Sequence, residues 1–247
     1  MEIKYLETDR HYAIPYYARI PDEPQRIIII SHGFGSSKDS PTAQLMLNGL
    51  AEAGLGTLAF DFPAHGSSRA GVQALRVKNC MEDVADLETM LTTQYPQAEI
   101  GYFSSSFGAF INLLYISTHR HKGDRSFLRS AAVNMPSLFD REMTEAQRTE
   151  LEETGQLVLD QEPPVTIPAG FLDDMKMYDL FSQYEPDETQ IGMVHGDSDE
   201  VIEPKIAVAF SAYYEIPAAF IPGGTHHLDG EGMPEHILAM AEEFFRS

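Results

Sequence analysis

The chain has 247 residues, of which 43% are hydrophobic and 22% charged, and its 38 acidic against 17 Lys and Arg residues give a formal net charge of −21. A surface this acidic repels phosphate backbones and anionic lipid headgroups, so the composition argues against nucleic-acid or membrane-surface binding. The single cysteine, Cys80, excludes an internal disulfide and a cysteine-based metal cluster.

The hydropathy pattern indicates a soluble protein. No stretch approaches the roughly 18 consecutive apolar residues of a membrane span, and the first residues lack the apolar core of a secretion signal. A chain of this length can bury one large core. We therefore expect a single cytoplasmic domain over residues 1–247.

Short strand-like runs alternate with helical patterns along the chain. Residues 26–31 include four consecutive isoleucines, which is typical of a strand buried on both faces. The expected strands are residues 2–8, 11–20, 26–31, 56–60, 99–103, 130–134, 190–195 and 218–222. The expected helices are residues 42–53, 73–94, 108–119, 204–215 and 234–246. This alternation predicts an α/β fold with a doubly wound, mostly parallel sheet.

One segment interrupts the alternation. Residues 135–189 occupy about 55 positions where a simple crossover needs far fewer. They include a charged helical run over residues 144–159. We expect a small cap or lid, inserted after the sixth strand. Its apolar side chains either line a substrate pocket or anchor the segment on the sheet: Phe139, Phe171, Leu172, Met175, Met177, Tyr178 and Phe181.

Polar motifs follow four of the expected strands. Ligands of an open parallel sheet bind at the carboxyl ends of its strands, so these positions are the candidate site. The motifs are SHGFGSS at residues 31–37, SSSFGA at 104–109, GDSDEVI at 196–202 and GGTHHL at 223–228. A serine, an acid and a histidine thus occur in that order, each after a strand.

Ser106 is the expected nucleophile. A sharp strand-to-helix turn requires small residues two positions before and two after the nucleophile, because the backbone passes close to its neighbours there. Ser106 has Ser104 and Gly108 in those places, whereas Ser105 would have two phenylalanines. A helix N-cap is the structural alternative for such a serine.

Two pairs of residues compete for the remaining roles. His226 and His227 are adjacent candidates for the general base, and we prefer His226. Asp197 and Asp199 compete for the acid that orients the base, and we prefer Asp199.

Negative charge that develops on a carbonyl oxygen requires two backbone N–H donors. Phe107 directly follows the nucleophile at a helix N-terminus, and Phe34 lies in the glycine loop at residues 32–35. We expect their N–H groups to form the oxyanion hole. The glycine loop does not have the spacing of a phosphate-binding loop.

The chain resembles the α/β-hydrolase superfamily over nearly its whole length. Five motifs match landmarks of that family in order: HGFGS at 32–36, DFPAHGS at 61–67, the turn at Ser106, HGDSD at 195–199 and GGTH at 223–226. At the turn, S-x-S-x-G replaces the more usual G-x-S-x-G. The resemblance implies an eight-stranded, mostly parallel sheet with an antiparallel exception near the N-terminus. It also implies the triad Ser106, Asp199 and His226, with a structural role for His65.

Within the superfamily the chain is similar to microbial carboxylesterases, including feruloyl- or cinnamoyl-esterase-like and monoacylglycerol-lipase-like enzymes. The expected activity is therefore cofactor-free and metal-free hydrolysis of a small-molecule carboxylic ester through an acyl-enzyme. The alternatives are a thioesterase, an aminopeptidase or an acyltransferase with the same triad, or a non-catalytic binding protein. A metallohydrolase is a further alternative, but the absence of an HExxH motif argues against it.

The negative charge is unevenly distributed. Residues 134–203 contain 18 acidic side chains but only three basic ones, Arg141, Arg148 and Lys176. This segment includes the expected cap and the loop of Asp199. If the charge surrounds the entrance of the site, it disfavours anionic substrates, so the sequence favours a neutral or cationic ester. A solvated surface is the alternative explanation.

Overall fold

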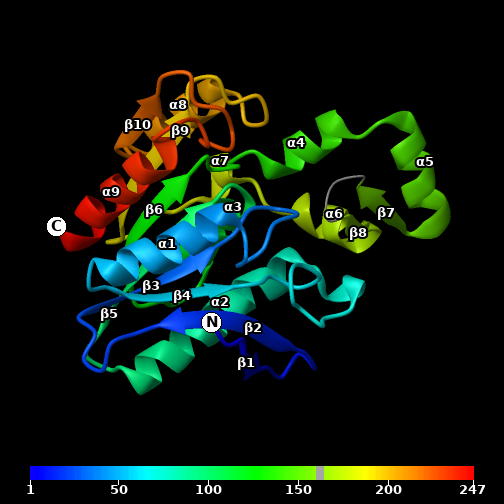
Figure 1. The fold of residues 1–247 in the computed structure, drawn as a ribbon. Helices are drawn as coiled ribbons and strands as arrows, with labels where there is room; N and C mark the ends of the chain where they lie inside the picture. The colour runs from blue at the N-terminus through cyan, green and yellow to red at the C-terminus, as the bar shows by residue number, and fades with distance from the viewer. Residues whose placement is uncertain (160–163) are drawn as a thin grey trace.

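The computed structural model describes residues 1–159 and 164–247. Eight strands form one sheet in the order β1-β2-β4-β3-β5-β6-β9-β10 (Figure 1). Their bounds are β1 Lys4–Glu7, β2 Ala13–Arg19, β3 Arg26–Ser31, β4 Gly56–Phe60, β5 Glu99–Ser105, β6 Gly123–Arg129, β9 Gln190–Gly196 and β10 Ala218–Ile221. Strands β3 to β10 of this sheet pair in parallel, whereas β2 pairs antiparallel with β1 and β4. The mostly parallel sheet and its N-terminal exception are thus confirmed.

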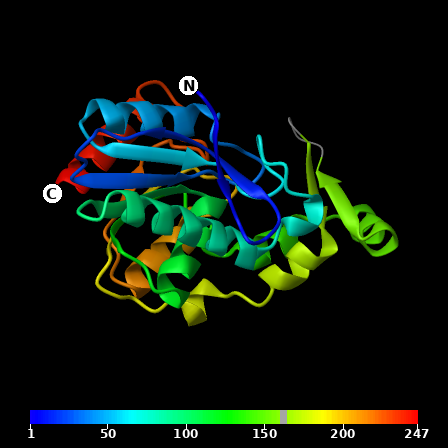
Figure 2. The same cartoon turned by 90° about the horizontal axis from the view of Figure 1, so that it is seen from below.

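Helices cover both faces of the sheet. The main helices are α1 Pro41–Glu52, α2 Val77–Gln94, α3 Phe107–Thr118, α8 Pro204–Tyr213 and α9 Met233–Arg246, and a short 3-10 helix, η1 Val72–Ala74, precedes α2. Helices α1 and α9 lie on one face, while α2 and α3 lie on the other (Figure 2). Apolar side chains of β3 alternate between two buried cores, because Ile28 and Ile30 pack toward α1 and Ile27 and Ile29 pack toward α2 and α3.

The prediction of a strand over residues 130–134 is wrong. The sixth strand of the sheet, β6, spans Gly123–Arg129, and residues 130–134 form the turn that follows it. Three polar or charged side chains, Asp124, Arg125 and Ser126, break the apolar pattern of β6. Their partners come from distant elements: the Arg125 Nη1–H donates to the Phe244 carbonyl, and the Ser126 hydroxyl donates to Asn112 Oδ1.

The segment between β6 and β9 contains short elements that extend away from the sheet (Figures 1 and 2). They are α4 Met135–Glu142, α5 Glu145–Thr154, β7 Gln156–Leu159, β8 Val165–Pro168, α6 Ala169–Met175 and α7 Leu180–Gln183. The expected helix over 144–159 is therefore too long. Thr144 begins α5 with a capping box to Gln147, and Gly155, in the left-handed conformation, ends it before β7.

None of the helices in the described ranges combines the length and the apolar character needed to cross a membrane.

Candidate active site

Ser106 occupies a strained turn between β5 and α3. Its backbone has φ 50° and ψ −112°, in a region that residues other than glycine rarely adopt. The Ser106 N–H donates to the Arg129 carbonyl at 2.9 Å, and the Ser106 carbonyl accepts from the Ala109 and Phe110 N–H groups at the start of α3. These bonds hold the strained residue in place. No side-chain capping bond is formed by Ser106 in α3.

The neighbours of Ser106 explain the small residues of the motif. A Cβ on Gly108 would lie 2.7 Å from the His32 carbonyl oxygen and 2.8 Å from that of Ser31, and both are backbone atoms. The Ser104 side chain is fully buried, and its hydroxyl has no hydrogen-bond partner in the described structure. Burying a hydroxyl without a hydrogen-bond partner is unfavourable, so Ser104 lowers the stability of the fold relative to the glycine that is more usual at this position.

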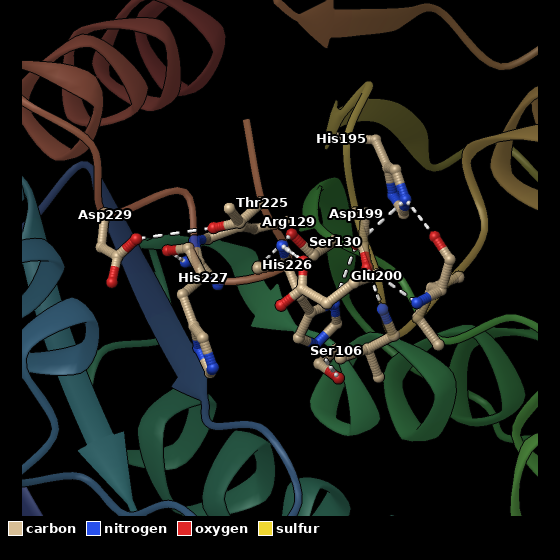
Figure 3. A network of polar contacts seen from close by, with 12 residues as sticks. Ser106, Arg129, Ser130, His195, Asp199, Glu200, Thr225, His226, His227 and Asp229 are labelled. Carbon is tan, nitrogen blue, oxygen red and sulfur yellow. Dashed lines mark hydrogen bonds and ion pairs between the residues drawn. The ribbon is translucent and has the colours of Figure 1, made fainter. Parts of the chain in front are cut away.

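The structure places Ser106, His226 and Asp199 in one hydrogen-bonded chain (Figure 3). His226 Nε2 lies 3.0 Å from Ser106 Oγ, and His226 Nδ1 lies 2.8 Å from Asp199 Oδ2. Because a carboxylate can only accept, the Nδ1–H donates to Asp199, and Nε2 is then free to accept the hydroxyl proton of Ser106. His226 is mostly buried, and the Asp199 side chain is completely buried.

Asp199 is held as a carboxylate on both of its oxygens. Oδ1 accepts from the Val201 N–H at 2.9 Å and from the Ile202 N–H at 2.7 Å, while Oδ2 contacts His226 and, at 3.1 Å, His195 Nε2. Burial alone would raise the pKa of Asp199, but the hydrogen bonds from the two histidines and the backbone lower it well below its ordinary value. The group that faces His226 is therefore an anion at neutral pH.

The competing candidates lie elsewhere. The exposed His227 ring is centred 5.7 Å from that of His226 and makes no hydrogen bond to Ser106 or Asp199. Asp197 is exposed, and its Oδ1 accepts instead from the Gly223 N–H at 2.7 Å and from the Ser198 hydroxyl at 3.0 Å. The structure therefore brings together the preferred member of each pair.

The two expected oxyanion donors lie on adjoining segments. Phe107 is the first residue of α3, and Phe34 lies in the loop after β3, with the two rings centred 5.5 Å apart. Neither backbone N–H meets an acceptor in the described part of the chain. His32 holds the loop: its Nδ1–H donates to the Gly33 carbonyl at 2.7 Å, and its Nε2 accepts from the Phe62 N–H at 3.1 Å.

The motif at residues 61–67 is a structural turn. Asp61 Oδ1 accepts from the Lys38 N–H at 2.6 Å, and Oδ2 accepts from the Ser67 N–H at 2.7 Å and from the Lys38 ammonium at 3.0 Å. Gly66 has φ +51°, and a Cβ there would lie 2.5 Å from the Asp61 carboxylate. Burial lowers the pKa of His65 to about 4, so this ring is neutral while its Nδ1–H donates to the Pro63 carbonyl.

Four further residues contact the site and were not assigned roles from the sequence, among them Glu200, whose Oε2 accepts from the His226 N–H at 3.2 Å. The Ser130 hydroxyl donates to the His226 carbonyl at 2.9 Å, and the Arg129 Nη2–H donates to the His227 carbonyl. His195 contacts Asp199, as described above. A charged residue at the end of a buried strand was the available signal for Arg129. The sequence pattern instead predicts the strand after Arg129.

Some apolar side chains of the segment between β6 and β9 pack against the rest of the chain, and others line a cavity that no residue of the triad reaches. Phe171 is fully buried and contacts Phe34 and Phe107, and Phe181 packs on Phe210, so these two anchor the segment. A cavity of about 630 Å³ lies between α4, α5 and α6, with Phe139 among its lining residues. Met177 is 71% exposed and takes part in neither.

No group of three His, Cys, Asp or Glu side chains within residues 1–159 and 164–247 is arranged to hold a metal ion.

Solved structures with this architecture come from several organisms. Est1E from Butyrivibrio proteoclasticus, in a structure with bound ferulic acid, is 20% identical with a TM-score of 0.81, covering 99% of this chain and 100% of the other. Mouse alpha/beta hydrolase domain-containing protein 10 is 16% identical with a TM-score of 0.79, covering 100% and 99%. At such identities the likeness concerns the fold.

Two curated proteins of Mycobacterium tuberculosis, named as candidate phosphoribosyl transferases, are 30% identical over 92 residues, or 36% of this chain. The match spans only 21% of the length of those relatives. A family model described as serine aminopeptidase, S33, matches residues 22–163, which is more than half of the chain. The chain therefore belongs to this family of the α/β-hydrolase superfamily.

Proposed function

We propose that this protein is a serine hydrolase that cleaves carboxylic esters through an acyl-enzyme, with Ser106 as nucleophile, His226 as general base and Asp199 as the acid that orients the base. One observation supports the proposal most strongly. The hydrogen-bonded chain from Ser106 Oγ through the His226 ring to Asp199 Oδ2 begins at a residue held in a strained turn and ends at a buried anion.

The first half-reaction forms the acyl-enzyme. Ser106 Oγ attacks the ester carbonyl carbon while His226 Nε2 takes the hydroxyl proton, and Asp199 stabilises the resulting imidazolium. The C–O bond to the alcohol then breaks, and His226 returns its proton to the leaving oxygen. The backbone N–H groups of Phe34 and Phe107 donate to the carbonyl oxygen as it becomes negative. Such a donor typically contributes about 10²–10³-fold to the rate.

The second half-reaction releases the acid. Water loses a proton to His226 and attacks the acyl carbon, and the proton then moves to Ser106 Oγ as the acyl–oxygen bond breaks. The strained φ of Ser106 supports this chemistry, because it exposes Oγ at the carboxyl edge of the sheet. In this proposal, residues 135–159 and 164–189 form the cap of the site, since Phe171 of α6 packs against the residues that carry both oxyanion donors.

The substrate is a small-molecule ester in this proposal. Esterases among the similar folds, such as Est1E and an esterase from Pyrococcus furiosus, favour ester chemistry over the amide chemistry in the family's description. The same three residues would also serve a thioesterase or an acyltransferase. Parallel assays with a p-nitrophenyl ester, a thioester, an aminoacyl anilide and an added alcohol acceptor separate these activities.

The experiment compares Ser106→Ala with Ser105→Ala in hydrolysis of p-nitrophenyl acetate. Ser105 is the matched control, because it is the neighbouring serine and lines the same cavity without contacting His226. We expect Ser106→Ala to abolish turnover and Ser105→Ala to retain most of it. Activity that survives in Ser106→Ala and is lost in Ser105→Ala contradicts the assignment. A folded wild-type protein that hydrolyses none of the three substrates and transfers no acyl group to the alcohol contradicts the enzymatic function itself.

A further inference from the structure

Two adjoining cavities lie on the α1 side of the sheet, and Ser106 lines the first of them. The first has a volume of about 300 Å³ and is lined by residues that include Ser105, Ser106, Arg129 and His226. The second, of about 290 Å³, extends toward the start of α9. Arg129 and Asp229 both line the two cavities, so these side chains lie where the cavities meet.

Arg129 differs from the other buried cations of the described chain. Arg26 forms ion pairs with Glu99 and Asp124, and Lys38 forms ion pairs with Asp39 and Asp61. Arg129 is only 6% exposed, yet no carboxylate within residues 1–159 and 164–247 lies within ion-pairing distance of it. Its Nη2–H donates to the His227 carbonyl, and the guanidinium makes no other hydrogen bond within those ranges. A buried charge without a counter-ion is costly, so its retention requires an explanation.

The surroundings of Arg129 leave it positively charged. Burial lowers its pKa to about 10, and the more distant carboxylates of Asp229 and Asp199 act in the opposite direction, so the guanidinium is protonated at neutral pH. Asp199 is already bound by two histidines. Asp229 is exposed and contacts the Thr225 hydroxyl at 3.5 Å. The N-terminus of α1, whose first residues also line the first cavity, adds positive potential.

We propose that Arg129 binds a carboxylate group of the ester substrate in the cavity beside Ser106, and thereby selects substrates that carry a negative charge. The proposal rests on the proposed esterase function of Ser106. A planar guanidinium with free N–H donors matches a carboxylate in a bidentate arrangement. The ligand would supply the counter-ion that the protein does not.

This proposal reverses the expectation of a neutral or cationic ester. That expectation counted the acidic residues of 134–203 without placing them. The structure places Glu200 at the site, where its Oε2 accepts from the His226 N–H, whereas Glu145, Glu150, Glu152 and Glu153 lie on α5, at the tip of the segment that extends away from the sheet (Figures 1 and 2). Their field is screened over about 10 Å at ordinary salt, whereas Arg129 lines the same cavity as Ser106.

The test compares esters that differ only in a charged group. One pair carries it on the acyl part: 4-nitrophenyl hydrogen succinate and its methyl ester. The other carries it on the alcohol part: 4-acetoxybenzoate and its methyl ester. We expect wild-type protein to prefer the carboxylate in at least one pair by about ten- to hundred-fold in kcat/KM, the value of hydrogen bonds to a charged group.

Arg129→Met should remove this preference, and Arg129→Lys should retain part of it. Because Arg129 also contacts the loop of His226, Ser130→Ala is the matched control, since it removes the neighbouring hydrogen bond to that loop. Ser130→Ala should lower the rates of both esters in a pair by the same factor. Asp229→Asn, which removes the opposing charge, should increase the preference for the carboxylate.

Binding is measured separately by calorimetry on the Ser106→Ala protein, with succinate and 4-hydroxybenzoate as probes. Tighter binding of either acid than of its methyl ester, if it is lost in Arg129→Met, supports the carboxylate site. A lack of ester hydrolysis beside such binding contradicts only the proposed function. Hydrolysis of all four esters with an unchanged charge preference in Arg129→Met overturns the Arg129 proposal and leaves the esterase function intact.

Discussion

Asp199→Asn changes one atom of the proposed triad and is expected to remove nearly all activity. The Asn Oδ1 can still accept from the Val201 and Ile202 N–H groups, so the loop is retained. The amide nitrogen, however, would replace Oδ2, which lies 2.8 Å from His226 Nδ1. An amide N–H donates, so His226 must accept through Nδ1 and carry its proton on Nε2.

In that tautomer His226 cannot take the Ser106 proton, because its Nε2–H faces Ser106 Oγ at 3.0 Å. The imidazolium also loses its carboxylate partner. Together these effects are expected to lower kcat by about 10⁴-fold, equivalent to about 5 kcal/mol in the activation barrier. The KM for a small ester should change little, since Asp199 does not line the cavity beside Ser106.

Asp197→Asn is the matched control. Asp197 lies two residues away and is exposed, and an asparagine there can still accept from the Gly223 N–H. We expect its kcat to stay within about twofold of wild type, in line with surface substitutions generally. Initial rates on p-nitrophenyl acetate, with folding checked by circular dichroism, provide the comparison. Folded Asp199→Asn that keeps more than about a tenth of wild-type kcat, or a loss of activity in Asp197→Asn instead, contradicts the role of Asp199.

Four further predictions concern stability and reactivity. Gly108→Ala would place a Cβ 2.7 Å from the His32 carbonyl oxygen and 2.8 Å from that of Ser31, so it should lower the free energy of unfolding by about 1–3 kcal/mol; an unchanged Tm would contradict this. Ser104→Ala removes a buried, unpartnered hydroxyl and should leave stability unchanged or raise it by about 1 kcal/mol in urea unfolding, whereas a clear loss would show that the hydroxyl is bonded. Burial lowers the pKa of His32 to about 4 from its ordinary 6.5, so the unfolded state binds more protons in this window, and the contribution of His32 to the free energy of unfolding should fall by up to about 3 kcal/mol as pH decreases from 6.5 to 4. His32→Gln should reduce that slope, and an unchanged slope would contradict the assignment. Burial also raises the pKa of the Cys80 thiol, so a disulfide reagent such as 5,5′-dithiobis(2-nitrobenzoate) should react only after denaturation, and rapid labelling of the native protein would contradict this.

Sequence patterns predict those strands whose apolar residues follow directly from their buried position in the sheet. The four isoleucines within residues 26–31 predict β3 with its observed bounds, because a central parallel strand is buried on both faces. Strand β6 is as buried at its carboxyl end, but its polar side chains bond to residues far away in the chain. Such partners leave no local pattern, so the strand was placed seven residues too late.

The same distinction applies to the site. Steric requirements around Ser106 act over two residues on each side, and they single out this serine from the sequence alone. The choice between Asp197 and Asp199 depends on which carboxylate faces His226, and the sequence could support only a preference. The contacts of Arg129 and Ser130 with the loop of His226 join segments almost a hundred residues apart. They required the three-dimensional structure.

The proposed function depends on Ser106 as the activated nucleophile. The most direct measurement is to treat the native protein with a fluorophosphonate and to locate the adduct by mass spectrometry of the digested chain. We predict one adduct, on Ser106, that forms rapidly at neutral pH and fails to form in Asp199→Asn. An adduct on another residue, or no adduct on a protein shown to be folded, would contradict the claim.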